Sequence, residues 1–106
     1  MTQGMKLAAV MVVAASVAMP AFAAGTGEAD YKAKCAMCHG ADGLAATGMG
    51  KTMNIKSFKD PAQVKLTDAE LIAATTKGKG KMPAYAGKLT DAQITDVIAY
   101  IRMLQK

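Results

Sequence analysis

Two cysteines and the only histidine of the chain lie within five consecutive residues. Cys35 and Cys38 are separated by two residues, and His39 follows the second thiol directly. A thiol pair at this spacing, with an adjacent imidazole, is the pattern by which a c-type haem is attached. Each sulfur can add to one vinyl group of the porphyrin as a thioether, and the imidazole can then bind the iron. The pattern predicts one haem c held by Cys35 and Cys38, with His39 as an axial ligand.

A CxxC spacing alone also occurs in zinc sites and thiol-disulfide centres. A closed zinc site needs about four Cys or His ligands, and this chain offers only Cys35, Cys38 and His39. A thioredoxin-like centre lies near a strand-helix-strand pattern, and no alternating β-branched run occurs beyond the first twenty residues. A haem-free thiol or zinc protein is therefore the least favoured interpretation. It predicts a colourless product with free thiols.

A sixth iron ligand has to come from a residue other than histidine. Thioether sulfur is the strongest candidate, and the methionines beyond residue 23 are Met37, Met49, Met53, Met82 and Met103. Met37 lies inside the attachment motif and cannot reach the opposite face of the haem. Met82 is favoured because Pro83 fixes the backbone angle beside it and because the surrounding segment is unsuited to regular structure. Chain length alone does not exclude Met49 or Met53.

Residues 1–23 have the features of a cleaved secretory signal. A basic residue near the start is followed by a largely apolar run that ends at Met19, and Ala21-Phe22-Ala23 matches the small-x-small cleavage pattern. The run is shorter than the roughly 20 residues that a bilayer span needs. We therefore expect a single domain in residues 24–106, exported to the periplasm or another such compartment, with no stable membrane span after cleavage.

Two segments begin with the same helix-start chemistry. Thr67 and Thr90 are each followed three residues later by Glu or Gln, between apolar residues, which is a capping box with a hydrophobic staple. These signals predict helices that end near Lys77 and Leu104, the first with Gly78 as a left-handed C-cap. The last helix should bury one apolar stripe. Its members are Ile94, Val97, Ile98, Ile101 and Leu104, flanked by Tyr100 and opposite Met103.

A further helix is expected to begin at Gly27, with Glu28 and Asp30 in its first turn, where acids suit the helix dipole. Gly27, Tyr31 and Cys35 share one face of this helix. Residues 40–59 show no sustained period and predict an irregular wrap over one haem edge. Its expected pocket-lining residues are Met49, Met53, Ile55 and Phe58. With two Phe, three Tyr and no Trp in the chain, the haem itself must supply much of the apolar nucleus.

Together these residues resemble a class I c-type cytochrome over essentially the whole of residues 24–106. Gly27, Tyr31, Val97 and Tyr100 match the contact between the first and last helices of that family, and Lys81-Met82-Pro83 resembles its distal ligand loop. The resemblance implies a small all-α cytochrome c fold of three to four helices around one covalent haem. It also implies Met82 as the second axial ligand. The family often has a proline that accepts a hydrogen bond from the proximal histidine, and none lies between His39 and Pro61.

The leading functional hypothesis is a soluble, monomeric electron-transfer protein with His/Met ligation, and not an enzyme. A haem-based sensor or small peroxidase is the alternative, but that chemistry needs distal polar groups and the chain lacks a second histidine. The chain carries a net charge of +5. Lys77, Lys79 and Lys81 predict a positive surface that steers an acidic redox protein to the haem edge, although such a run can also be a solvated face. No nucleic-acid partner is expected.

Overall fold

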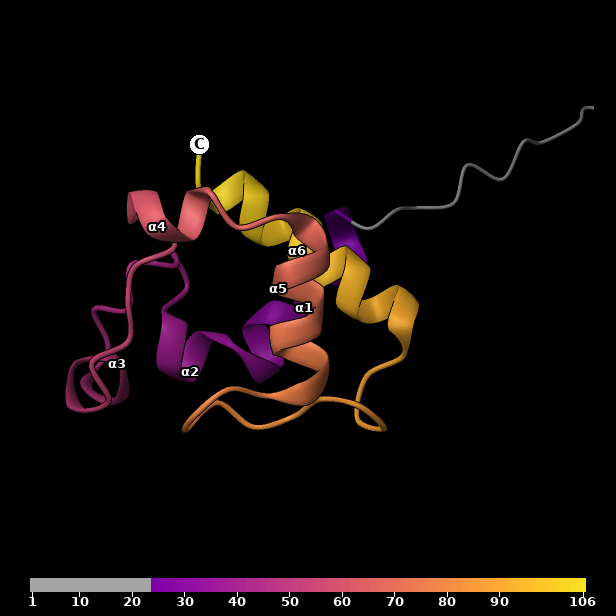
Figure 1. The fold of residues 1–106 in the computed structure, drawn as a ribbon, viewed down its shortest axis with the longest axis horizontal. Helices are drawn as coiled ribbons and strands as arrows, with labels where there is room; N and C mark the ends of the chain where they lie inside the picture. The colour runs from indigo at the N-terminus through magenta and orange to yellow at the C-terminus, as the bar shows by residue number, and fades with distance from the viewer. Residues whose placement is uncertain (1–23) are drawn as a thin grey trace, which may run out of the picture.

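The computed structural model describes residues 24–106, and the predicted signal in residues 1–23 lies outside this part (Figure 1). Three of its helices are long: α1 (Ala24–Lys34), α5 (Asp68–Lys77) and α6 (Asp91–Leu104). Three are single turns: α2 (Ala36–His39), α3 (Gly48–Thr52) and α4 (Pro61–Val64). Residues 24–106 contain isolated β-bridges but no strand, so the all-α prediction is confirmed. No helix in this range is long and apolar enough to cross a bilayer.

The two predicted capping boxes are confirmed. The hydroxyl of Thr67 accepts a hydrogen bond from the amide of Glu70, and that of Thr90 accepts one from the amide of Gln93, each at 3.1 Å. The Glu and Gln side chains accept the threonine amides in return. Gly78 does end α5 with a φ of 78°, but its ψ of 167° is not the left-handed helical conformation that we predicted. The chain there turns directly into a short loop, so no further helical turn forms.

The start of α1 differs from the prediction. The first described residue, Ala24, is already helical, so the helix does not begin at Gly27, and Glu28 and Asp30 do not lie in a first turn where they would have the dipole role that we expected. Gly27 lies within the helix, where an added Cβ would overlap the carbonyl oxygen of Asp96 in α6. Packing on α6 therefore stabilises this end of the helix, more than the propensities of its residues do.

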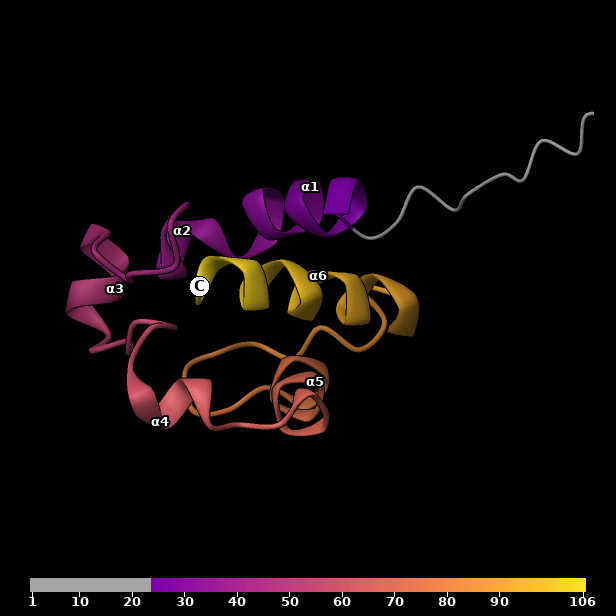
Figure 2. The same cartoon turned by 90° about the horizontal axis from the view of Figure 1, so that it is seen from above.

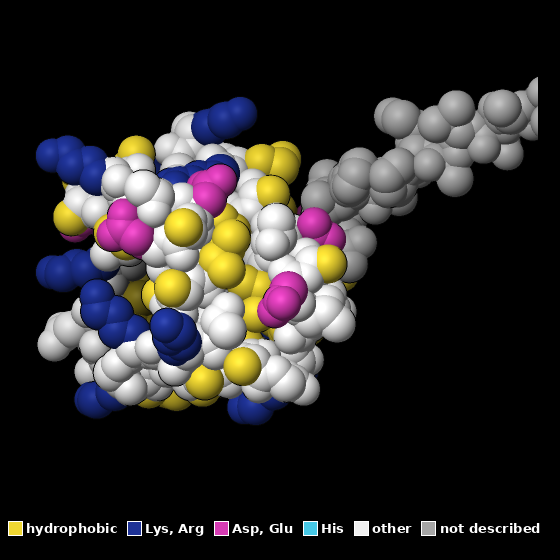
Figure 3. Space-filling view, turned by 45° about the vertical axis from the view of Figure 1, so that its right-hand side comes forward, with side chains coloured by type: hydrophobic (Ala, Val, Ile, Leu, Met, Phe, Trp, Pro, Cys, Tyr) yellow, Lys and Arg dark blue, Asp and Glu magenta, His cyan; other side chains and the backbone are white. Residues whose placement is uncertain are grey.

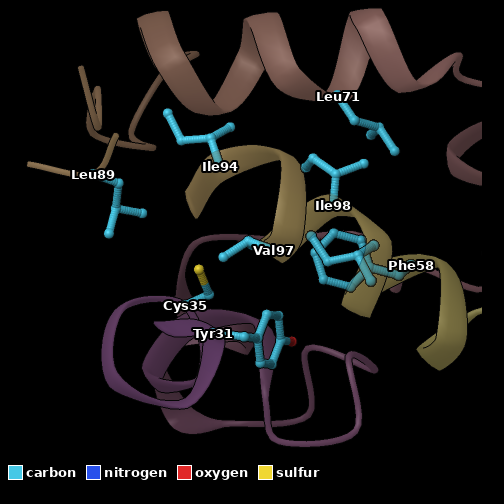
Figure 4. Close-up of a cluster of buried hydrophobic side chains, with 9 residues drawn as sticks. Tyr31, Cys35, Phe58, Leu71, Leu89, Ile94, Val97 and Ile98 are labelled. Carbon is cyan, nitrogen blue, oxygen red and sulfur yellow. The ribbon is translucent and has the colours of Figure 1, made fainter. Parts of the chain in front are cut away.

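Among the described helices, α1 and α6 make the most extensive contact, and they lie side by side in Figure 2. Tyr31 and Val97 are both fully buried, and the rings of Tyr31 and Tyr100 lie 5.2 Å apart between centroids. The predicted stripe of α6 faces this core and α5 (Figure 4), whereas Met103 is exposed as expected. We call the contact made by Gly27, Tyr31, Val97 and Tyr100 the helix crossing.

The C-terminal turn of α6 holds the segment that leads into α5. Arg102 Nε donates to Asp68 Oδ1 at 2.8 Å, and the same guanidinium donates to the carbonyl oxygen of Leu66. Gln105 Nε2 donates to the carbonyl oxygen of Phe58 at 3.1 Å. These bonds fasten residues 58–68 to α6, while α5 lies on the side of α6 away from α1 (Figure 2).

Candidate haem site

The attachment motif forms one compact turn at the end of α1. The amide of His39 donates to the carbonyl oxygen of Cys35 at 2.9 Å, so the short helix α2 presents Cys38 and His39 close to the first thiol. The hydroxyl of Tyr31 donates to the carbonyl oxygen of Gly40 at 2.6 Å and ties the end of α2 back to α1. Burial raises the pKa of Tyr31 far above its ordinary value, which keeps the hydroxyl a hydrogen-bond donor.

Cys35, Cys38, His39 and Met82 all line a single cavity of about 570 Å³. That volume falls within the roughly 300–1,000 Å³ of ordinary ligand pockets. The other walls come from α5, α6 and the residues around Phe58, and most of the lining is apolar. The structure thus brings together the four site residues that the sequence analysis singled out.

Burial favours the neutral forms of Cys35 and His39. It raises the pKa of the Cys35 thiol to about 11, and the nearby Asp30 carboxyl and Cys38 add to the shift. Burial also lowers the pKa of His39, which favours the neutral imidazole that binds metals. A buried neutral sulfur suits a thioether, and a buried neutral ring suits an iron ligand, so the donor set fits a covalently attached haem.

Phe58 orients the ring of His39. The two rings are stacked, with centroids 4.5 Å apart and an angle of 17° between their planes. The backbone of Phe58 is fixed by two hydrogen bonds. Its amide donates to the carbonyl of Gly43 at 2.9 Å, and its carbonyl accepts from the side chain of Gln105. His39 Nδ1 is buried without a hydrogen-bond partner among the described residues. Stacking therefore fixes the plane of the His39 ring, but it does not supply the hydrogen-bond acceptor that a proline carbonyl often supplies in the family that this sequence resembles.

Two of the candidate methionines line the cavity: Met82 and Met53. Met49 does not, and our prediction that it lines the pocket was wrong. Residues 48–52 form the helical turn α3, which was not expected, and the turn buries Gly50 against the carbonyls of Cys38 and Ala45 while Met49 stays 42% exposed. Thr47 caps this turn and also donates to the carbonyl of Cys38 at 3.0 Å.

Residues 78–85, which we call the distal loop, present Met82. The amide of Met82 donates to the carbonyl of Lys79 at 3.0 Å, and the amide of Lys79 donates back to Met82 at 3.1 Å. The turn between them requires Gly80, whose φ is +58°. The hydrogen bonds of this loop set the backbone of Met82 without any helix.

Four lysines line the cavity: Lys34, Lys56, Lys79 and Lys81. No Asp or Glu of the described residues does so. Figure 3 shows Lys and Arg side chains along the top, left and lower edges of one face, Asp and Glu side chains at its upper left and right, and hydrophobic side chains across its middle. Lys77, which we grouped with Lys79 and Lys81, is exposed on α5 outside the cavity. Lys34 and Lys56 were missed, because no sequence pattern joins them to the lysines near Met82.

Comparisons with known proteins agree with this geometry. Residues 22–101 match the model of the family described as cytochrome C oxidase, cbb3-type, subunit III. Cytochrome c6 of Leptolyngbya boryana is 37% identical over 81 residues, which cover 74% of this chain and 88% of that protein. The chain belongs to the cytochrome c family, as a small class I member.

Two further comparisons support this assignment. The cytochrome is 35% identical over 75 residues to cytochrome c6 of Synechocystis sp., covering 71% of its own length and 60% of that relative. The solved structure of the KustC0563 c-type cytochrome superposes with a TM-score of 0.69 at 28% identity, covering 76% of this chain and 98% of that one. Like its homologues, this cytochrome carries covalently bound haem c and is an electron carrier rather than an enzyme.

Proposed function

We propose that this cytochrome holds its haem through thioethers at Cys35 and Cys38, and that His39 and Met82 are the two axial ligands. The supporting observation is that these four side chains, from two distant segments of the chain, line one apolar cavity. The haem supplies one-electron redox chemistry when bound. A neutral imidazole and a thioether need not change protonation when the electron arrives or leaves. The thioether is a soft ligand, so it favours the reduced state and a higher potential.

Replacing each methionine in turn tests the ligand assignment. Met82→Ala should remove the Met–iron absorption band, lower the reduction potential and admit cyanide or imidazole. Met53→Ala is the decisive comparison, because Met53 lines the same cavity. Met49→Ala is the control at an exposed methionine. Loss of the band in Met53→Ala, with the band kept in Met82→Ala, would show that Met53 is the ligand.

The lysines at the cavity support a docking site for acidic redox proteins. Lys79 and Lys81 flank the turn that presents Met82, and Lys34 directly precedes Cys35, so positive charge surrounds the region where both ligand segments meet. Opposite charges across an interface raise the association rate, and salt screens the effect. A partner with a carboxylate-rich surface would thus be steered to the haem.

Charge reversal tests this docking site with a matched control. Lys79→Glu with Lys81→Glu should slow electron exchange with an acidic partner by about tenfold or more at low salt. Lys51→Glu with Lys106→Glu makes the same change in net charge at exposed lysines outside the cavity, and it should have a much smaller effect. Equal slowing in the two double variants would mean that only net charge matters.

We also propose that residues 1–23 are a cleaved export signal and that residues 24–106 form a single domain in the periplasm or another exported compartment. The supporting observation is the small-x-small pattern Ala21-Phe22-Ala23, which follows a largely apolar run that ends at Met19. Mass spectrometry of haem protein released from the periplasm should give a chain that starts at Ala24. A haem protein retained in the membrane fraction with residues 1–23 attached would contradict the proposal.

A further inference from the structure

Tyr85 connects the distal loop to the attachment motif. Its hydroxyl donates a hydrogen bond of 2.9 Å to the carbonyl oxygen of Lys34, the residue directly before Cys35. The two partners are 51 positions apart in the sequence, so this bond joins two segments that the chain itself does not hold together. One of them presents the thiols and His39, and the other presents Met82.

The backbone of Tyr85 is anchored as well. Its amide donates to the carbonyl of Thr75 in α5 at 3.0 Å, and its carbonyl accepts from the amides of Lys88 and Leu89, each at 3.0 Å. Thr75 is buried and donates its own hydroxyl to the carbonyl of Leu71 at 2.9 Å. The backbone of Tyr85 is therefore held against α5 by the hydrogen bond to Thr75, and its side chain extends along one wall of the cavity to Lys34.

Only Pro83 and Ala84 separate Met82 from Tyr85. Proline restricts the backbone of this short connection, so a movement of Tyr85 away from Lys34 would carry Met82 with it. At the other end of the loop, Gly78 packs beneath the same residues, since a Cβ there would come within 2.7 Å of the carbonyl oxygen of Met82. Both ends of the distal loop are therefore held in place, one by the packing of Gly78 and the other by the contacts of Tyr85. The Tyr85 end is bonded to the residue directly before the attachment motif.

We propose that Tyr85 is a positioning residue for Met82: its bond to Lys34 holds the distal loop close enough to the attachment motif for the thioether to stay on the iron. The proposal rests on the assignment of Met82 as ligand. Without the hydroxyl, the loop opens more readily, and an external ligand competes better with Met82. A purely structural role would change the stability of the whole domain and leave this competition unaltered.

Imidazole binding to the ferric protein measures the competition directly. Tyr85→Phe keeps the ring and removes only the hydroxyl, and it should raise the imidazole affinity by about fivefold, the size expected for one ordinary hydrogen bond. Tyr100→Phe is the matched control, because it removes a hydroxyl at the helix crossing, outside the cavity. Its imidazole affinity should equal that of the parent. An equal rise in both variants, or no rise in Tyr85→Phe, overturns the proposal.

A double-mutant cycle shows whether Tyr85 acts through Met82. In a Met82→Ala background no thioether has to be displaced, so Tyr85→Phe should leave the imidazole affinity unchanged. A fivefold rise in that background as well would mean that Tyr85 controls access to the cavity, and it would overturn the positioning role. If Met82→Ala alone keeps the Met–iron band, the ligand assignment fails instead, so the two failures are distinguishable.

Discussion

The helix crossing and the distal loop hold their residues in different ways. At the crossing, apolar side chains of α1 and α6 fill the space between two regular helices, and Tyr31 and Val97 are fully buried. In the distal loop the main chain is fixed by a few hydrogen bonds, and most of its residues are exposed. The crossing is a packed core in which Val97 alone borders the cavity of about 570 Å³, whereas most residues of the distal loop border it.

This difference indicates where the cofactor matters most for stability. Met53, Met82 and Pro83 line the cavity and keep part of their apolar surface exposed, and covering such surface contributes about 25 cal/mol per Å². The helix crossing obtains that contribution from its own side chains. The distal loop, most of whose residues are exposed, obtains it only with the haem in place, as expected for a domain too small to build a large core.

The largest effect should follow from removing both thiols. Cys35→Ser with Cys38→Ser should abolish covalent haem, and the distal loop should then lose its order while α1 and α6 keep the most protection. A reduced spectrum of the denatured protein detects covalent haem, and hydrogen exchange compares the two regions. Met37→Ala, at a side chain that is 73% exposed within the same motif, should attach haem normally. A full yield of covalent haem from the double serine variant would refute the attachment proposal.

The next largest effect should come from the helix crossing. Gly27→Ala places a methyl group where the carbonyl oxygen of Asp96 lies, and we expect it to lower the free energy of unfolding by about 3 kcal/mol, as overpacking in a rigid core does. Gly48→Ala is the control within a helix, since its added Cβ would meet no atom within 4 Å. It should change the free energy by less than about 1 kcal/mol. Denaturant unfolding of the holoprotein measures both, and similar values would mean that the crossing is adaptable.

The smallest effect should come from removing the helix caps, and it should distinguish the distal loop from the helix crossing. Thr67→Ala and Thr90→Ala remove the same capping box from α5 and from α6, and each should cost about 1 kcal/mol of stability. Because α5 carries the distal loop, only Thr67→Ala should also raise the affinity of the ferric protein for imidazole. If Thr90→Ala raised it equally, the two regions would open together as one unit.

Local signals in the sequence were enough to predict α5 and α6. A capping box depends on residues three positions apart, so Thr67 and Thr90 identify a helix start in any fold that leaves the box intact. The apolar stripe of α6 and the exposed position of Met103 follow from helical periodicity in the same way.

The sequence alone determined the chemistry of this protein. Cys35, Cys38 and His39 are adjacent in the chain, and Met82 could be chosen by its neighbours, so donor types and short spacings pointed to haem c and to two axial ligands. Tertiary structure alone decided what surrounds the proposed ligands: the stacking of Phe58 on His39, the lysines at the cavity, the exposure of Met49 and the bond from Tyr85 to Lys34. These contacts join residues far apart in the chain. No local pattern encodes them, because they depend on how separate helices and loops pack around one cavity.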